Sequence, residues 1–317
     1  MRVVFFGTPE FATASLEALA SHPGVELAAV VTATDKRGGR GGGRLLESDV
    51  KRAALALGLP VLQPKTLRGS RFLTRLRALE ADLFVVVAFR MLPRLVWDMP
   101  PLGTVNVHGS LLPAYRGAAP IHWAVINGET ETGVTTFFLR HVIDTGDLLL
   151  QKRTPVGPDE TTGEVYERLR HLGAEALRES VDLIAAGQTT GTPQDESRAS
   201  HAPKVFRDDA RVDWAASAKT CHDLIRGMSP FPGAWTEFDG REVKLLRSAR
   251  TTARSGAPAG TPLRLATGAR DGAAAGFGVS CGPDGEVLEL LEVKPAGKRL
   301  MSGRDYANGL RDLPAAG

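Results

Sequence analysis

Two polar side chains stand two positions apart where a β-branched strand gives way to a loop. Residues 105–123 have the sequence VNVHGSLLPAYRGAAPIHW, which places Asn106 and His108 at the predicted strand end. Positions i and i+2 of a strand project from one face. Open α/β sheets bind ligands at the carboxyl ends of their strands. We therefore expect a ligand site at this strand end.

A carboxylate follows the next strand-like run, GVTTFFL at 133–139, because Asp144 lies in the sequence IDTGD. If the two strand ends are neighbours, this carboxylate orients the imidazole and favours its charged form. The imidazole and the carboxamide would then donate to a developing oxyanion, which suits transfer of an acyl group. By spacing alone, the commoner role of a strand-end Asn and His is to hold a turn by hydrogen bonds.

Several other chemistries lack their sequence signals. No G-x-S-x-G elbow offers a nucleophile, so an acyl group would pass directly between bound molecules. Gly7 is followed by no glycine before Gly24, so the G-x-G-x-x-G fingerprint of a nicotinamide site is absent. Cys221 and Cys281 form neither a CxxC motif nor part of a metal-ligand spacing, and we expect no metal and no disulfide framework.

The composition is that of a globular protein of two domains. The chain has 317 residues, of which 43% are hydrophobic and 24% charged. Its net charge of +3 arises entirely after residue 200, as an excess that is either ordinary surface charge or suited to a polyanion. The N-terminus has no signal-peptide pattern, and no run reaches the roughly 18 apolar residues of a membrane span. These features favour a cytoplasmic protein without a membrane partner.

Short apolar runs alternate with helical patterns over the first 190 residues. We expect strands at 2–6, 27–33, 83–88 and 104–107, and continuous apolar strands between helices indicate a parallel sheet covered on both faces. One helix is predicted to begin near Pro9. Another is predicted to begin at a capping box of Thr161 and Glu164 and to end at Gly187. The fold class is therefore α/β, with a doubly wound, mostly parallel sheet.

The helical and strand periodicity is lost over 188–206, where Thr, Ser, Pro and charge dominate. We predict a catalytic domain over 1–188, a linker over 189–206 and a second domain over 207–317. After one helix near 216–226, short strands and the turn Asp239-Gly240 predict a small β-barrel. Trp214 and Trp235 are expected in its core rather than on its surface as base-stacking platforms.

A basic, glycine-rich segment, DKRGGRGGGR at 35–44, packs four cations and five glycines into the nine residues after Asp35. Such a segment is either a solvated flexible linker or a loop that becomes ordered on phosphates. No G-K-[ST] follows, which rules out a P-loop.

The sequence NVHGSLLPAYRGAAPIHWAVINGETETGVT, followed by IDTGD, resembles the folate-dependent formyltransferases. The resemblance extends along the chain through VVFFGTPEFA, LPVLQPKTLR, ARVDW and PAGKRLMSGRDYANG. It implies a Rossmann-like catalytic domain followed by a barrel with an oligonucleotide-binding (OB-like) fold. It also implies 10-formyltetrahydrofolate as formyl donor, the α-amino group of methionyl initiator tRNA as acceptor, and catalysis by Asn106, His108 and Asp144. No obligate protein partner is implied.

The resemblance also implies binding residues. For the folate they are Val87, Phe89, Met91, Ser110, Leu111, Leu112 and Pro113. For the tRNA they are the cations of the basic segment, Lys36, Arg37, Arg40 and Arg44. In the barrel, the candidate contacts to a nucleic-acid backbone are Lys204, Arg241, Lys244, Arg247, Lys298 and Arg299, although the commoner role of each such residue alone is a solvated surface charge. Related enzymes often have an acidic residue and a glycine shortly before the Asp-Thr-Gly, whereas this chain has residues 140–143, RHVI, which leaves the local shape of the pterin site open.

Two alternatives remain at this point. One is a formyltransferase of the same architecture acting on glycinamide ribonucleotide or a nucleotide-linked amino sugar, and the other is a nucleic-acid-binding protein with an inactive α/β domain. A small acceptor needs neither the basic segment nor the barrel, which disfavours the first. The presence of all three candidate catalytic residues disfavours the second.

Overall fold

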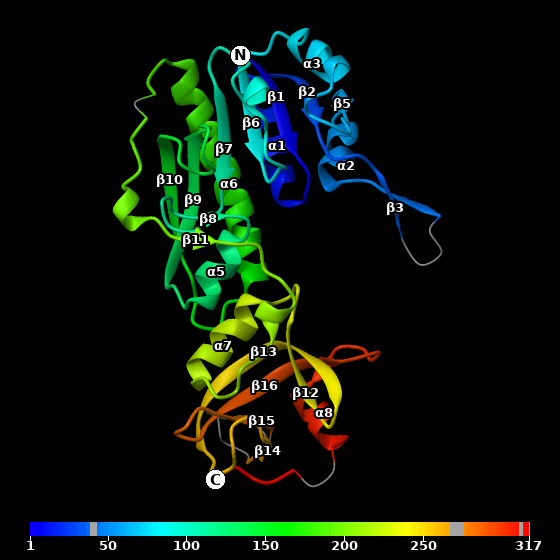
Figure 1. The fold of residues 1–317 in the computed structure, drawn as a ribbon, viewed down its shortest axis with the longest axis vertical. Helices are drawn as coiled ribbons and strands as arrows, with labels where there is room; N and C mark the ends of the chain where they lie inside the picture. Colours follow the sequence, from blue (N-terminus) through cyan, green and yellow to red (C-terminus); the bar gives the residue numbers. More distant parts are fainter. Residues whose placement is uncertain (39–42, 190, 267–275, 311–312, 317) are drawn as a thin grey trace. The chain divides into compact units, whose positions relative to one another are not determined.

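The computed structural model describes residues 1–38, 43–189, 191–266, 276–310 and 313–316 (Figure 1). The chain divides into two compact units, neither of which is continuous in sequence. Unit 1 comprises Met1–Pro120, Thr132–Thr154 and Tyr166–Ala202, and unit 2 comprises Ile121–Glu131, Pro155–Val165 and Pro203–Gly317. Two short segments from the first half of the chain therefore belong to the same unit as its C-terminal part.

Unit 1 is built on a seven-stranded sheet with the order β10-β9-β7-β6-β1-β2-β5. Strand β1 pairs in parallel with β2 and β6, β2 pairs in parallel with β5, and β6 pairs in parallel with β7. Strand β9 runs antiparallel to β7. The mostly parallel α/β sheet predicted from the sequence is therefore confirmed. The strands are β1 (Arg2–Gly7), β2 (Glu26–Val31), β5 (Val61–Leu62), β6 (Leu83–Val87), β7 (Thr104–His108), β9 (Glu131–Phe138) and β10 (Leu148–Pro155).

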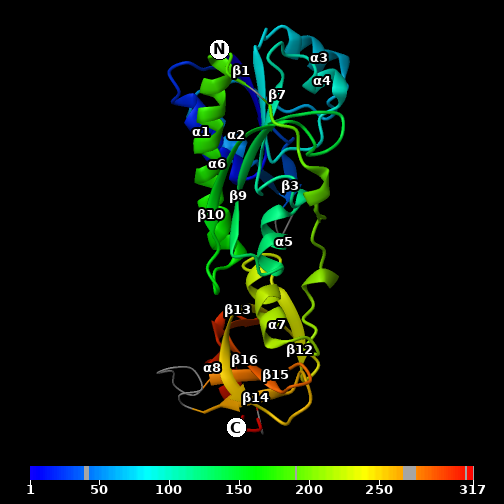
Figure 2. The same ribbon diagram turned by 90° about the vertical axis from the view of Figure 1, so that its left-hand side faces the viewer.

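Helices cover both faces of this sheet. In Figure 2, α1 (Phe11–Ala20) and α6 (Thr162–Ala185) lie along one face, and α3 (Ser70–Arg77) and α4 (Arg94–Trp97) lie on the other. Successive side chains of a strand point to opposite faces, so Val4 and Phe6 join the hydrophobic cluster on the α3 side. Because both faces are buried, the central strands are apolar throughout, which is why they were recognisable in the sequence.

The start of α6 confirms the predicted capping box. The Thr161 backbone N–H donates to Glu164 Oε2 over 2.7 Å, and the Glu164 N–H donates to Thr161 Oγ1 over 3.3 Å. The first helix begins at Phe11, two residues after Pro9. The remaining helices of this half of the chain are α2 (Asp49–Ala56) and α5 (Pro120–Ile126).

The basic segment includes one strand of a short antiparallel pair and the first residue of the other. Strands β3 (Lys36–Gly38) and β4 (Arg44–Leu46) pair antiparallel, with Lys36 opposite Leu46. Next to β3, Lys51 Nζ lies 2.5 Å from Asp35 Oδ2, and Gln63 Nε2 donates to Asp35 Oδ1 over 2.7 Å. Arg40 lies outside the described residues. The described part of the segment is thus tied to unit 1 at Asp35.

Unit 2 contains an antiparallel sheet with the order β12-β13-β16-β15-β14, and β17 pairs with β16. The predicted hairpin turn is confirmed, since Asp239 and Gly240 have φ of 50° and 70° between β12 and β13. Trp214 is 9% exposed in the core, as predicted, and Trp235 packs against the same cluster while partly buried. The arrangement agrees with the predicted small barrel. Its elements are α7 (Ala218–Gly227), β12 (Ala234–Phe238), β13 (Arg241–Arg254), β14 (Pro262–Leu265), β15 (Gly276–Cys281), β16 (Glu286–Pro295), β17 (Met301–Ser302) and α8 (Gly303–Asn308).

Residues 189–202 remain with unit 1. Strand β11 (His201–Ala202) pairs in parallel with β8 (Arg116–Gly117), and one turn of 3₁₀ helix spans Glu196–Arg198. Within the described ranges, no helix is long and apolar enough to cross a bilayer.

Candidate active site

Strand β7 presents Asn106 and His108 as predicted. Asn106 lies opposite Val86 of β6 and Phe137 of β9, and His108 is the last residue of the strand. The His108 side chain is buried, whereas Asn106 is only partly so. Among the residues that the structure describes, the Asn106 carboxamide has no hydrogen-bond partner. A partly buried amide with unused donors at the carboxyl end of a parallel strand is suited to binding a ligand oxygen.

The two ring nitrogens of His108 face different groups. Nε2 lies 2.8 Å from the Tyr115 carbonyl oxygen, and Nδ1 lies 3.7 Å from Asp144 Oδ2. A carbonyl oxygen only accepts, so Nε2 carries a hydrogen and donates it. Nδ1 is therefore the nitrogen directed at the carboxylate, and a protonated ring would be an ion-pair partner of Asp144.

Asp144 reaches His108 by a route that the sequence did not predict. The two strand ends are not neighbours, because β9 is antiparallel to β7 and its last residue, Phe138, lies opposite Val105. The loop after β9 instead brings the carboxylate back to the end of β7. There Asp144 is buried, has φ of +54°, and accepts the Gly117 N–H at Oδ2 over 3.0 Å.

The loop after His108 contains four of the predicted folate residues and is tied to β9. Thr135 Oγ1 donates to the Ser110 carbonyl over 2.7 Å and accepts the Leu112 N–H over 3.0 Å. Ser110 Oγ donates to the Ala114 carbonyl over 2.6 Å. Ser110 and Leu112 are buried, and Leu111 and Pro113 are half-buried. The loop is therefore held in one shape by its own residues and by Thr135.

The other predicted folate residues lie at the end of the adjacent strand. Val87, the last residue of β6, lies opposite Val107 of β7. The Phe89 ring lies 5.7 Å from the Phe6 ring, and Met91 is 71% exposed. Parallel pairing of β6 with β7 thus brings both predicted folate segments to the same edge of the sheet.

The segment before Asp144, residues 140–143, is largely exposed. Arg140 forms an ion pair with Asp147 across the loop. Val142 is 61% exposed and Ile143 is 55% exposed. An exposed apolar pair therefore stands next to Asp144.

The predicted tRNA-binding cations differ in their availability. The exposed ones are Lys36, Arg37, Lys204, Arg241, Lys298 and Arg299. Lys204 Nζ lies 5.5 Å from the centroid of the Phe206 ring. Arg247 is paired with Glu164 at 2.6 Å, and Lys244 Nζ donates to the Pro232 carbonyl over 2.7 Å. Arg247 and Lys244 therefore already bind partners within unit 2. Arg44 is the first residue of β4.

Sequence reasoning missed three residues that bind the loops next to His108 and Asp144. Gln194, Glu196 and Ser200 come from the segment predicted as a linker. Ser200 Oγ accepts the Tyr115 N–H over 2.9 Å, and Gln194 and Glu196 both bind the Arg116 guanidinium. These contacts join residues about 80 positions apart, so no local pattern could have revealed them. The one local signal was Arg116, a cation in the loop after β7 that would need a partner if it were buried.

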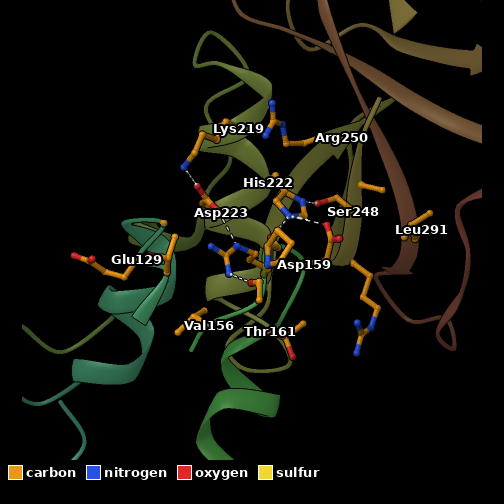
Figure 3. Close-up of a pocket in the computed structure, with 17 residues that line it drawn as sticks. Glu129, Val156, Asp159, Thr161, Lys219, His222, Asp223, Ser248, Arg250 and Leu291 are labelled. Atoms are coloured by element: carbon orange, nitrogen blue, oxygen red, sulfur yellow. Dashed lines mark hydrogen bonds and ion pairs between the residues drawn. The ribbon is translucent and has the colours of Figure 1, made fainter. Parts of the chain in front are cut away.

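A separate pocket of about 550 Å³ lies within unit 2, and it contains none of the predicted catalytic or folate residues (Figure 3). Burial lowers the pKa of His222, whose Nδ1 lies 2.9 Å from Ser248 Oγ and whose Nε2 lies 3.0 Å from the Pro158 carbonyl. Asp223 pairs with Arg226 and Lys219, both at 2.7 Å. Both His222 and Asp223 therefore bind other residues of the pocket wall.

No group of three or more His, Cys, Asp or Glu side chains is placed to hold a metal ion in the part of the chain that the structure describes.

Comparison with known proteins identifies the family of the chain. Residues 1–181 match the formyl transferase family, and residues 204–311 match the formyl transferase C-terminal domain. Because the first match covers more than half of the chain, the protein belongs to the formyl transferase family.

Particular relatives are similar over nearly their whole length. A methionyl-tRNA formyltransferase of Parabacteroides distasonis is 44% identical over 328 residues, which cover 99% of this chain and 97% of that protein. A methionyl-tRNA formyltransferase of Moorella thermoacetica is 44% identical over 315 residues, covering 99% of this chain and 98% of that protein.

Solved structures share the fold at low identity. The sugar 3N-formyl transferase WlaRD, solved with dTDP and 5-N-formyl-THF, has a TM-score of 0.68 at 16% identity and covers 94% of this chain and 99% of its own. HypX from Aquifex aeolicus, solved with tetrahydrofolic acid, has a TM-score of 0.62 at 18% identity and covers 99% of this chain and 48% of its own.

Proposed function

We propose that this chain transfers the formyl group of 10-formyltetrahydrofolate to the α-amino group of methionyl initiator tRNA, for translation initiation. The observation that carries the proposal is the pairing of His108 with Asp144, 3.7 Å apart, on the strand that also carries Asn106, whose carboxamide has no partner among the described residues. Relatives named for this activity are similar along the whole chain. We further propose that residues 1–188 carry the catalytic site, that 207–317 contribute to tRNA binding, and that the protein works in the cytoplasm.

The folate co-substrate supplies an activated formyl carbon. In the proposed reaction the α-amino nitrogen forms a bond to this carbon, the bond from the carbon to N10 breaks, and the proton lost by the amine ends on the departing N10. Negative charge develops on the formyl oxygen during the attack. The protein's task is to place N–H donors at that oxygen before the reaction begins.

Asn106 and His108 are the proposed donors. The Asn106 carboxamide has free hydrogens among the described residues, whereas the Nε2 hydrogen of His108 is directed at the Tyr115 carbonyl. We propose that His108 exchanges this carbonyl for the formyl oxygen when substrates bind. Asp144, whose Oδ2 lies 3.7 Å from Nδ1, is proposed to orient the ring so that Nε2 faces the formyl oxygen.

The folate is proposed to lie along the ends of β6 and β7, against Val87, Phe89, Met91 and the loop 110–113. The apolar or half-buried side chains of this edge suit a pterin ring, and backbone groups of the loop can fix its orientation. The exposed cations Lys36 and Arg37, with Arg40 and Arg44, are proposed to contact the tRNA, as are Lys204, Lys298 and Arg299 of unit 2.

A single assay tests the proposal. The purified protein is mixed with 10-formyltetrahydrofolate and, in separate reactions, methionyl initiator tRNA, glycinamide ribonucleotide or a nucleotide-linked amino sugar. We expect formylation of the methionyl-tRNA, detected as formyl-methionine after deacylation. Efficient formylation of a small acceptor in its place would overturn the acceptor assignment, and failure with all three would overturn the proposed function.

A further inference from the structure

Gln194 contacts the backbone on both sides of the Asp144 turn. Its Nε2 donates to the carbonyl oxygens of Asp144 and Gly146, each over 2.8 Å. The residue belongs to the segment between the two predicted domains, 50 positions after Asp144 in the sequence. Both hydrogens of one side-chain amide are therefore used to hold one short turn.

The orientation of this amide is fixed by Arg116. Arg116 donates to Gln194 Oε1 from Nε over 3.1 Å and from Nη2 over 2.6 Å. A guanidinium can only donate and a carbonyl can only accept, so exchanging the amide oxygen and nitrogen would break every one of these bonds.

Arg116 is itself fixed from its other side. It is 7% exposed, and Glu196 accepts from Nη1 over 2.8 Å and from Nη2 over 2.7 Å. The bond to Glu196 raises the pKa of Arg116 and outweighs the opposing effect of burial, so the cation is stabilised. Glu196, Arg116 and Gln194 thus form a chain of charge-assisted hydrogen bonds that ends on the Asp144 backbone.

The Asp144 turn needs such support because its geometry is not one that the chain adopts easily. Asp144 has φ of +54°, in the left-handed region that residues other than glycine rarely occupy. Gly146 is packed so closely that a Cβ there would lie 1.5 Å from the Phe138 carbonyl oxygen. Relaxation of this turn would move the Asp144 carboxylate away from His108 and the Gly117 N–H.

We propose that Gln194 is a positioning residue for formyl transfer, which holds the Asp144 turn so that the carboxylate faces His108. The inference rests on the proposed function for its kinetic readout, and on the hydrogen bonds of Gln194 for its mechanism. Gln194 acts through Asp144 and has no contact with substrate in this assignment. The segment that joins the two predicted domains is thereby part of the catalytic apparatus.

The first test replaces the amide by side chains of similar size. Gln194→Met removes both donors, and Gln194→Glu presents carboxylate oxygens to two carbonyls. Displacement of a reacting group by about 1 Å can cost about a hundredfold in rate, and we expect kcat to fall about tenfold to a hundredfold, with KM for both substrates changed less than about threefold. Gln188→Met is the matched control, because Gln188 is an exposed glutamine a few residues earlier without a side-chain partner among the described residues.

The second test is a double-mutant cycle with Asp144. If Gln194 acts only through Asp144, then Gln194→Met costs nothing further in an Asp144→Ala background. An equal fold-loss in both backgrounds would show that the effect is general and would overturn the proposal, as would a wild-type kcat in both Gln194 variants.

A third measurement does not depend on activity. The ring signals of His108 in an NMR spectrum report the position of the Asp144 carboxylate. We expect them to change in Gln194→Met as they change in Asp144→Asn, and to stay unchanged in Gln188→Met. Unchanged His108 signals in Gln194→Met would overturn the positioning role even if the acceptor turned out to be another amine. Absence of formyl transfer by the wild type, with altered His108 signals in the variant, would contradict only the proposed function.

Discussion

The turn around Asp144 and the basic strand pair of β3 and β4 are proposed to serve the same reaction, yet they are built in opposite ways. Asp144 is buried, and its backbone and side chain accept hydrogen bonds from Gln194 and Gly117. Lys36 and Arg37 are exposed and have no partner among the described residues, and next to β3 the chain is held by the ion pair of Asp35 with Lys51.

The contrast follows from what each region has to recognise. A developing oxyanion is small and short-lived, so its donors must be fixed in advance. A phosphate backbone carries many charges along its length, and cations bind it by neutralising charge and releasing counterions without one fixed geometry. We therefore expect substitutions at the first region to act on kcat, and substitutions at the second to act on tRNA affinity and its salt dependence.

The largest expected effect is at the catalytic trio. Asn106→Ala, His108→Ala or Asp144→Ala should each lower kcat by roughly a hundredfold or more, the scale of losing an oxyanion donor or a positioned charge. Steady-state kinetics measures this, with His171→Ala, an exposed histidine on α6, as the control. A His108→Ala enzyme with nearly normal turnover would contradict the mechanism.

The next effect is at Arg40, the centre of the basic segment. Arg40→Leu should raise KM for tRNA and lower kcat, so that kcat/KM falls about tenfold. The reason is that contacts of the basic segment with the acceptor stem would both bind the tRNA and position its amine for attack. Folate affinity should stay unchanged. The control is Arg71→Leu, an exposed arginine on α3. If both tRNA parameters and their salt dependence are unaltered, the segment is only a linker.

A smaller effect is expected at Lys298 and Arg299. Replacing both by alanine should weaken tRNA binding about threefold to tenfold and reduce the slope of log K against log salt by about two or less, since two phosphate contacts are lost. The double substitution leaves kcat at saturating tRNA unchanged. Filter binding at several salt concentrations tests it, and an unchanged slope would remove these residues from the interface.

The smallest effect concerns Glu164 and pH. Burial would raise its pKa, but hydrogen bonds from Arg247 and Thr161 outweigh burial and lower the pKa to about 2 from its usual 4.5. A carboxyl group with a lowered pKa stabilises the fold above its ordinary pKa, and this contribution disappears as pH falls from about 4.5 toward about 2. Glu164→Gln should therefore cost at most about 1 kcal/mol at pH 7, because the pair is partly exposed.

Urea unfolding at pH 7 and at pH 3 measures this difference. The gap in stability between wild type and Glu164→Gln should narrow at the lower pH. Glu17→Gln, at an exposed position on α1, should leave stability nearly unchanged at both pH values. If the difference in the free energy of unfolding is the same at both pH values, the charge of the Glu164 carboxylate is not its cause.

What could be predicted from the sequence depends on how local its cause is. The apolar runs of β1 and β7, the Thr161 capping box and the Asp239-Gly240 turn each follow from residues a few positions apart, and all are present. The i, i+2 placement of Asn106 and His108 follows from strand geometry. Asp144 was identified as a candidate, but the path of the loop that brings its carboxylate to His108 was not. Nothing in the local sequence encodes the antiparallel direction of β9.

The remaining features depend on long-range packing. Gln194 lies in a segment whose composition indicates only a lack of regular structure, and its role arises from bonds to Asp144 and Arg116. Likewise, the packing of 121–131 and 155–165 with the C-terminal part leaves no periodic signal in either segment. Such contacts are specified by the whole fold.

The interleaving of the two units has a consequence for biosynthesis. Ile121–Glu131 and Pro155–Val165 leave the ribosome well before Pro203–Gly317, the part of unit 2 with which they pack. Thr162 Oγ1 and the Gly163 N–H must wait for the carbonyls of Gly227 and Ser229, their acceptors in the folded chain. Until then these polar groups and the apolar side of Ile126 stay unprotected in the nascent chain, where chaperones and proteases act. A chain that ends before Pro203 would lack these partners and would leave both segments unprotected.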